Sequence, residues 1–256
     1  MNLLNTKILK LKLRDTSTKT IIERIEKSEV ISRTADGVNE VVVYWGLDEM
    51  IELNNILNLN KNLPSPITRD YKWVGLYKPF DHQRITSEFL SINDRAFCFN
   101  EAGTGKTSSA LWAADYLMNE GKVKRVLIIC PLSIMYSAWQ GDIFNTCMHR
   151  TSQVCHGTAD KRRTIINSGC DFVIINYDGV AIIKEEIKDI DFDLIIIDEA
   201  NAYKSTTTSR WKTLAKIVRP HTKIWMMTGT PASQSPEDAY GLAKLVCPHR
   251  VPKFKM

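Results

Sequence analysis

A short glycine-rich loop, set between an apolar run and a helical pattern, constrains the fold of this chain more than any other feature. A strand, a loop and a helix in this order form a phosphate cradle, because glycines let successive backbone N–H groups point at phosphate oxygens. The N-terminus of the following helix adds partial positive charge. The loop and the first residues of the helix are Asn100, Glu101, Ala102, Gly103, Thr104, Gly105, Lys106 and Thr107.

This loop predicts a nucleotide site. Lys106 is expected to reach the β- and γ-phosphates, and the Thr107 hydroxyl is expected to ligate Mg²⁺. The strict motif has glycine at position 100, where this chain has Asn100, so a loop that merely turns the chain is the alternative. The predicted cofactor-binding residues of the loop are Ala102, Gly103, Thr104, Gly105, Lys106 and Thr107.

A second segment argues against a loop that merely turns the chain. Residues 193–197 form an apolar strand that is followed directly by Asp198 and Glu199. Acidic residues at the carboxyl end of a buried strand lie at the edge of the sheet where ligands bind. We expect Asp198 to hold Mg²⁺ through water, and Glu199 to orient or deprotonate the water that attacks the γ-phosphate. A solvated strand end is the alternative. Together with Lys106, the two acids predict an ATPase-type core.

Composition is consistent with such a core. The chain has 256 residues, 44% of them apolar, which suffices for an α/β core and a small extra domain. The net charge is +5, and residues 1–70 contain ten basic and ten acidic residues, so the basic surplus lies in residues 71–256. This surplus suits a partner with phosphates.

The cysteines and the apolar runs indicate the cellular compartment of the protein. Six cysteines without C-x-x-C spacing predict no zinc site and favour a reducing, cytoplasmic compartment. No signal peptide is visible, and no apolar run approaches the roughly 18–20 residues that span a bilayer. We therefore expect no membrane partner.

The chain divides into three parts. Residues 1–60 predict a small α+β domain, with a strand at 8–13, a hairpin around Asp36 and Gly37, and a helix at 47–57. Residues 61–79 are predicted to form a linker, and residues 80–256 a RecA-like lobe.

In the third part, apolar runs alternate with amphipathic segments, which indicates an α/β fold with a parallel sheet and helices on both faces. The predicted strands are 96–99, 125–130, 172–176, 193–197 and 223–227. The predicted helices are 81–92, 106–119, 134–144, 159–167, 206–218 and 236–246.

Four further motifs accompany the loop and the acidic pair: residues 78–83 (KPFDHQ), 127–133 (LIICPLS, followed by Trp139 and Gln140), 171–177 (DFVIINY) and 226–231 (MMTGTP). In this order, across residues 78–248, they resemble the first RecA-like lobe of superfamily-2 helicases. The pattern is nearest to the Swi/Snf-type translocases and their helicase-like relatives in bacteriophages. The resemblance implies a P-loop NTPase lobe that uses ATP and Mg²⁺.

The resemblance also implies roles for several residues. Gln83 would read the adenine, although an exposed glutamine at a helix start is the alternative. Thr228, Gly229 and Thr230 would couple the state of the γ-phosphate to movement between lobes. Asn201 stands where most relatives have His or Asp, which puts the coupling to Thr228 in question.

Four residues would contact the nucleic-acid backbone: Pro131, Ser133, Asn176 and Tyr177. Ser133 as a helix N-cap and Tyr177 as a core residue are the alternatives. Asn176 departs from the Thr of the family's Thr-Tyr pair, so its DNA contact is in doubt.

A second lobe is expected because relatives use its arginines at the γ-phosphate. Such an arginine contributes about 10³–10⁵ in rate. Only 25 residues follow Pro231, so the chain is expected to be a fragment or half of a split protein. We predict the ATP-binding lobe of a DNA-dependent ATPase that moves along or remodels duplex DNA. The alternatives are a non-enzymatic nucleotide- or DNA-binding module and an RNA helicase lobe, against which the Thr-Gly-Thr-Pro motif argues.

Overall fold

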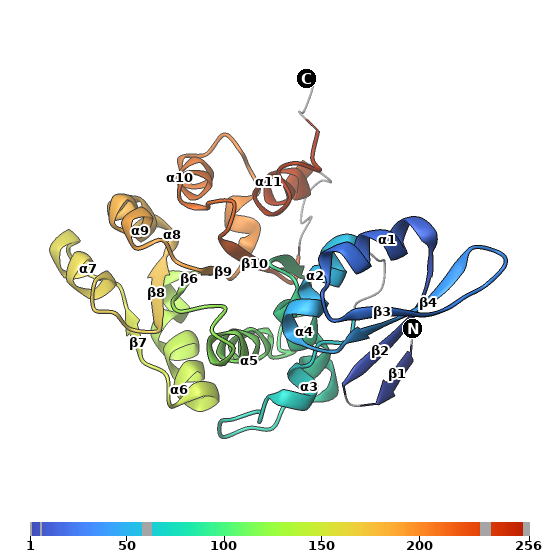
Figure 1. The fold of residues 1–256 in the computed structure, drawn as a ribbon. Coiled ribbons are helices and arrows are strands. Elements are labelled where there is room, and N and C mark those ends of the chain that lie inside the picture. Colours follow the sequence, from blue (N-terminus) through green and yellow to red (C-terminus); the bar gives the residue numbers. More distant parts are fainter. Residues whose placement is uncertain (1, 6, 58–62, 231–236, 253–256) are drawn as a thin grey trace. The chain divides into compact units, whose positions relative to one another are not determined.

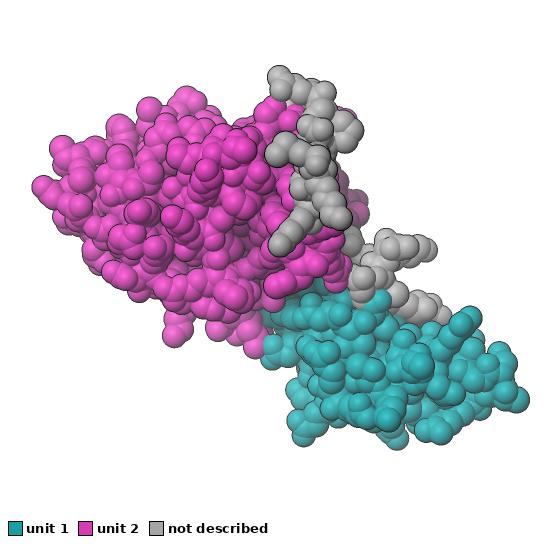
Figure 2. All heavy atoms as spheres, turned by 90° about the horizontal axis from the view of Figure 1, so that it is seen from above, with its two compact units in different colours: residues 1–72, 87–93 teal, residues 73–86, 94–256 magenta. Residues whose placement is uncertain are grey.

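The computed structural model describes residues 2–5, 7–57, 63–230 and 237–252. They belong to two compact units, residues 1–72 with 87–93 and residues 73–86 with 94–256 (Figure 2). The division falls within helix α4 (Asp81–Ile92), which contributes to both units. The first unit thus extends beyond the predicted 1–60 domain and includes part of the predicted linker.

The first unit contains a four-stranded antiparallel sheet in the order β1-β2-β4-β3. Side chains alternate between its faces, so Leu9 and Leu11 of β2 are buried opposite Val43 and Val41 of β4. Gly37 has a positive φ of 74°, as the predicted Asp-Gly turn requires. The elements are β1 (Asn2–Asn5), β2 (Ile8–Arg14), α1 (Asp15–Arg24), β3 (Ser28–Arg33), β4 (Val38–Tyr44), α2 (Leu47–Leu57) and α3 (Ile67–Asp70).

The second unit contains a six-stranded parallel sheet in the order β5-β10-β9-β6-β8-β7. Its strands are β5 (Arg95–Cys98), β6 (Val126–Cys130), β7 (Ser152–Val154), β8 (Phe172–Asn176), β9 (Leu194–Ile197) and β10 (Lys223–Met227). Its further helical segments are α5 (Lys106–Asn119), η1 (Leu132–Ile134), η2 (Met135–Gln140), α6 (Gly141–Cys147), α7 (Ala159–Ile166), α8 (Tyr177–Ile182), α9 (Lys184–Ile190), η3 (Ala200–Tyr203), α10 (Ser209–Ile217) and α11 (Glu237–Val246).

Helices cover both faces of this sheet, with α5 and α6 on one side and α7 to α11 on the other (Figure 1). Strands β6 and β9 are buried at every position, and β8 is buried at all but its last residue, Asn176. Strands of this kind are near-continuous apolar runs because no face meets water. The predicted parallel sheet with helices on both faces is confirmed. No helix in the described ranges has the length and apolar character of a membrane span.

The five predicted strands are present with bounds that differ by at most one residue. The sequence did not predict β7, α8 and α9, which are short and lie between longer elements. The prediction of one continuous α-helix over residues 134–144 was wrong. The chain there forms a 3₁₀ turn and a π-helical segment before α6 begins at Gly141. A π-helix has an extra residue in each turn, which rotates the side chains that follow.

Candidate nucleotide site

The parallel sheet brings the predicted motifs to one edge. The glycine loop follows β5, Thr228–Thr230 follow β10, the acidic pair follows β9, Pro131 follows β6 and Tyr177 follows β8. Because all six strands run in the same direction, these five carboxyl ends lie together. Strand β10 lies between the loop strand and the acidic strand, an order that the sequence alone did not predict.

The loop has the backbone that a phosphate cradle needs. Gly103 and Gly105 have φ values of 77° and 75°. The positive φ at Gly105 favours glycine, and a Cβ there would come within 2.0 Å of the Gln83 amide nitrogen and displace that side chain. Among the described non-glycine residues, only Trp73, Asp191 and Glu199 have positive φ. The backbone at Asn100 therefore does not require the glycine of the strict motif.

Lys106 is folded back over this loop. Its Nζ donates to the carbonyl oxygens of Asn100 at 2.9 Å and of Glu101 at 3.0 Å. The ammonium group therefore lies over the loop, where phosphate oxygens could replace the two carbonyls as acceptors. The Thr107 hydroxyl makes no hydrogen bond within the described part of the chain.

Gln83 is tied to the same loop. Its Oε1 accepts from the Phe80 N–H at 2.9 Å, and its Nε2 donates to the Thr104 carbonyl at 3.3 Å. The side chain is buried, so the alternative of an exposed glutamine is wrong. The exposed Phe80 ring stacks on His82, with centroids 5.8 Å apart. Recognition of adenine by Gln83 stays a prediction.

Asp198 is buried and held from two sides. Its Oδ2 accepts from Trp139 Nε1 at 3.0 Å, and its Oδ1 accepts from the Glu199 N–H at 3.0 Å. Burial raises the pKa of Asp198, while these two hydrogen bonds and the charge of Lys106 act in the opposite direction. Strand β10 pairs with both β5 and β9, so the loop and the acidic pair follow neighbouring parts of one sheet edge.

These residues fit a magnesium ion that is shared with a nucleotide. The described residues contain no cluster of three or more His, Cys, Asp or Glu that would hold a metal alone. Mg²⁺ prefers oxygen ligands, keeps several waters and binds through one or two protein groups plus phosphates. The Asp198 carboxylate and the Thr107 hydroxyl supply such groups.

The next residue, Glu199, has an unusual backbone. Its φ is 46° and its ψ is 57°, the left-handed conformation that is uncommon for a residue with a Cβ. Its carbonyl and that of Asp198 both accept from the Tyr177 hydroxyl, at 3.2 and 2.7 Å. Strained residues of this kind cluster at functional sites.

The Thr228–Thr230 segment contacts both parts of the site. Thr228 is fully buried, and its Oγ1 accepts from the Thr230 N–H at 3.2 Å. A Cβ on Gly229 would lie 3.6 Å from the Ala102 nitrogen, so Gly229 packs on the loop. Asn201 donates to Thr230 Oγ1 at 2.7 Å. Asn201 differs from the His or Asp of most relatives, but it still forms a hydrogen bond to this segment, through Thr230. Pro231 lies outside the described residues.

The four predicted nucleic-acid residues differ in their surroundings. Ser133 is exposed and caps no described helix, so the N-cap alternative is wrong. The Asn176 carboxamide oxygen accepts from Arg162 Nη1 at 3.3 Å. The Tyr177 hydroxyl points at the acidic pair, and Pro131 begins the turn after β6. Contact of these four residues with DNA stays a prediction.

The sequence indicated no role for two residues of the site. Trp139, on the π-helical segment, holds Asp198, and only its place after the Pro131 motif pointed to it. Arg162 is buried, and besides Asn176 its guanidinium donates to the carbonyls of Cys155 and Gly157. Nothing in the local pattern around Arg162 marked it as buried.

The Trp139 bond leads to a prediction. Trp139→Phe removes the indole N–H but keeps the aromatic ring, so Asp198 loses a donor. A hydrogen bond to a charged group contributes about 1.5–3 kcal/mol, and we expect the free energy of unfolding to fall by that amount. The Mg²⁺ concentration that half-saturates ATP binding should rise. Urea denaturation and nucleotide titrations over a Mg²⁺ series measure the two effects.

Trp211→Phe is the matched control, because Trp211 Nε1 donates to the Gly241 carbonyl at 2.8 Å. It should lower stability without changing the Mg²⁺ dependence. An unaltered Mg²⁺ dependence in Trp139→Phe would contradict a role for Trp139 in holding Asp198 for the metal.

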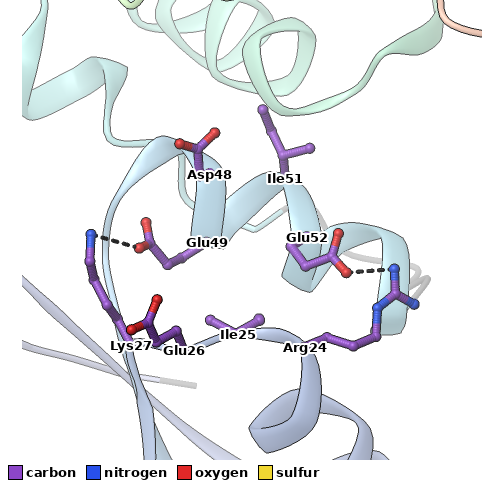
Figure 3. A pocket seen from close by; sticks show the side chains of 8 residues that line it. All are labelled: Arg24, Ile25, Glu26, Lys27, Asp48, Glu49, Ile51 and Glu52. Atoms are coloured by element: carbon purple, nitrogen blue, oxygen red, sulfur yellow. Dashed lines mark ion pairs between the residues drawn. The ribbon is translucent and has the colours of Figure 1, made fainter.

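A hollow on the first unit is a poor candidate for the nucleotide (Figure 3). Four carboxylates and two basic side chains line it, and Arg24 pairs with Glu52 while Lys27 pairs with Glu49. The remaining acidic charge would repel a polyphosphate or a DNA backbone. The lining residues are Arg24, Ile25, Glu26, Lys27, Asp48, Glu49, Ile51 and Glu52.

Known proteins resemble a large part of this chain. The SNF2-related domain family matches residues 86–255. An uncharacterized ATP-dependent helicase, YqhH of Bacillus subtilis (strain 168), is 24% identical over 180 residues, 69% of this chain and 30% of that protein. The SWI/SNF-related matrix-associated actin-dependent regulator of chromatin subfamily A-like protein 1 of Xenopus laevis is 25% identical over 190 residues. That match covers 72% of this chain and 18% of the relative.

A solved structure shares the fold. It is titled Sulfolobus solfataricus SWI2/SNF2 ATPase core in complex with dsDNA, and it matches with a TM-score of 0.60 at 19% identity. The match covers 70% of this chain and 38% of the solved one. This chain thus spans less than a third of the length of the two relatives above.

Proposed function

Because the chain belongs to the SNF2-related domain family, we propose that it is the ATP-binding lobe of a DNA-dependent ATPase that moves along or remodels duplex DNA. The observation that carries this proposal is the joining of the phosphate loop and the acidic pair at one sheet edge. Lys106 donates to loop carbonyls and its charge also acts on Asp198. A glycine loop that only turned the chain would need neither an acidic strand nor a buried carboxylate beside it.

In the proposed reaction, Lys106 leaves the loop carbonyls and donates to the β- and γ-phosphates of ATP. Glu199 accepts the proton of the attacking water, and Asp198 with Thr107 holds the metal site. When bound there, Mg²⁺ would neutralise the negative charge that develops on the phosphate. The Gln83 side chain lies beside the loop and is proposed to read adenine.

The proposed partners are duplex DNA and a second RecA-like lobe, in cis or in trans. Arginines of that lobe would stabilise the transition state, so turnover by this chain alone should be weak. The exposed Ser133 hydroxyl and the +5 net charge support a nucleic-acid partner. All six cysteines are free, which supports a reducing, cytoplasmic compartment.

Steady-state ATP hydrolysis with and without duplex DNA tests the proposal. It is measured on this chain alone and with a second RecA-like lobe supplied in cis or in trans. Strong stimulation by duplex DNA when both lobes are present is expected. DNA-independent rates in both samples, or none in either, would leave the alternative of a non-enzymatic nucleotide-binding module. Greater stimulation by RNA would favour an RNA helicase lobe.

A further inference from the structure

The backbone of the acidic pair is held by a side chain from another strand. Tyr177, the first residue after β8, donates its hydroxyl to the carbonyls of Asp198 and Glu199. The Glu199 carbonyl also accepts from the Ala202 N–H at 3.2 Å, which begins the turn of η3. Tyr177 therefore supports the one non-glycine residue of the described site that has a left-handed backbone.

The tyrosine ring is fixed on several sides. The Arg210 guanidinium lies 5.0 Å from the Tyr177 centroid and pairs with Asp178 at 2.6 Å. The Tyr203 ring meets it edge-on, with centroids 5.7 Å apart. Burial raises the pKa of Tyr177, and the charge of Asp198 acts in the same direction. The contacts on the ring hold the hydroxyl where it donates to the two carbonyls.

The preceding residue, Asn176, is positioned just as firmly. It accepts from Arg162, which also donates to the carbonyls of Cys155 and Gly157. A Cβ on Gly179 would lie 2.4 Å from Arg162 Nη1 and 2.7 Å from Asn176 Oδ1, so the turn is closely packed. A ligand that displaces Asn176 would therefore move a rigid turn, of which Tyr177 is part.

We propose that Tyr177 is a positioning residue that transmits nucleic-acid binding at the end of β8 to the backbone of Asp198 and Glu199. This inference rests on the proposed function, because it takes the nucleic acid as the ligand of that edge. The Glu199 carboxylate is placed by the φ and ψ of its own backbone, so a shift of the two carbonyls re-aims it toward or away from the attacking water.

Tyr203→Phe provides a matched control for Tyr177→Phe. Both substitutions remove one hydroxyl from the same pair of rings. The Tyr203 hydroxyl is buried and has no hydrogen-bond partner among the described residues, so its loss breaks no bond to the acidic pair. Because a buried unpaired hydroxyl is destabilising, we expect Tyr203→Phe to resist urea slightly better than the parent protein.

The experiment is amide hydrogen exchange on the whole chain, with and without a duplex DNA oligonucleotide. Without DNA, Tyr177→Phe should raise the amide exchange rate at residues 198–203 by about tenfold, because one hydrogen bond is lost. Tyr203→Phe should leave that rate unchanged. With DNA, residues 198–203 should become protected in the parent and in Tyr203→Phe, but not in Tyr177→Phe. The amides of Leu132 and Ser133 should be protected in all three proteins.

Turnover gives a second readout when a second lobe is supplied. In the presence of DNA, Tyr177→Phe should lower kcat about tenfold without changing the KM for ATP, since the hydroxyl does not contact the phosphate loop. Tyr203→Phe should keep the parent kcat.

The outcomes separate the two proposals. If DNA protects the amides of Leu132 and Ser133 but the three proteins behave alike at 198–203, the role of Tyr177 is overturned and the proposed function stands. If DNA protects no part of the parent chain and does not stimulate the two-lobed enzyme, the proposed function fails and the inference fails with it. A global loss of protection in Tyr177→Phe, rather than one confined to 198–203, would show a purely structural role and overturn the inference.

Discussion

Glu199→Gln is expected to bind ATP with the parent affinity while losing nearly all turnover. Glutamine has the same size and tolerates the same backbone, but it cannot accept the proton of the attacking water. General base catalysis contributes about 10²–10⁴ in rate, and we expect kcat to fall by a factor in this range. Single-turnover hydrolysis in the presence of duplex DNA and a second lobe measures the loss, and fluorescent nucleotide titration measures the affinity.

The control for this prediction is Glu120→Gln, which makes the same chemical change at an exposed residue that follows α5. It should retain the parent kcat. Parent-like turnover in Glu199→Gln would show that another residue activates the water. The position of Glu199 at the carboxyl end of β9 would then reflect only a solvated strand end.

Lys106→Ala is expected to weaken ATP binding severely. The ammonium group lies at the loop with two carbonyl acceptors, and phosphate oxygens of ATP would replace them with full negative charges. Hydrogen bonds to charged groups contribute about 1.5–3 kcal/mol each, so losing them should raise the Kd for ATP about 10²-fold or more. Equilibrium titration with a fluorescent ATP analogue and Mg²⁺ measures this change without any need for turnover.

Lys212→Ala, at an exposed position of α10, is the matched control and should bind ATP as the parent does. The unfolding midpoint in urea should confirm that Lys106→Ala is folded, because the lost contacts lie in an accessible loop. An unchanged Kd in Lys106→Ala would mean that the nucleotide binds elsewhere. It would remove the basis of the proposed function.

Local patterns were sufficient for much of the fold. The buried strands β6, β8 and β9 are continuous apolar runs, and such runs are rarely anything else when helical segments alternate with them. Helix α5 ends at Asn119, as predicted, and Gly121, which has a φ of 68°, follows it closely. Helices α8 and α9 were not predicted because each is only six or seven residues long, too short for a helical repeat to stand out in the sequence.

In the candidate site, too, the sequence predicted some residues and only the structure showed the roles of others. The identities of Lys106, Asp198 and Glu199 follow from motif chemistry, because few other residue types can bind phosphate, hold a metal or accept a proton in those places. The supporting roles of Trp139 and Tyr177 were not predicted. Trp139 reaches Asp198 across 59 positions of chain, and Tyr177 reaches the same strand end across 21.

The sequence by itself determined five of the six strands of the parallel sheet, the phosphate loop and the residue types at the strand ends, because each depends on a local pattern of residues. The tertiary structure decided the order of the strands, with β10 between the loop and the acidic pair. It also decided that a π-helical segment turns Trp139 toward Asp198, and that Tyr177 supports the backbone of Glu199. These contacts join residues distant along the chain, and they form only when packing brings separate strands to one edge.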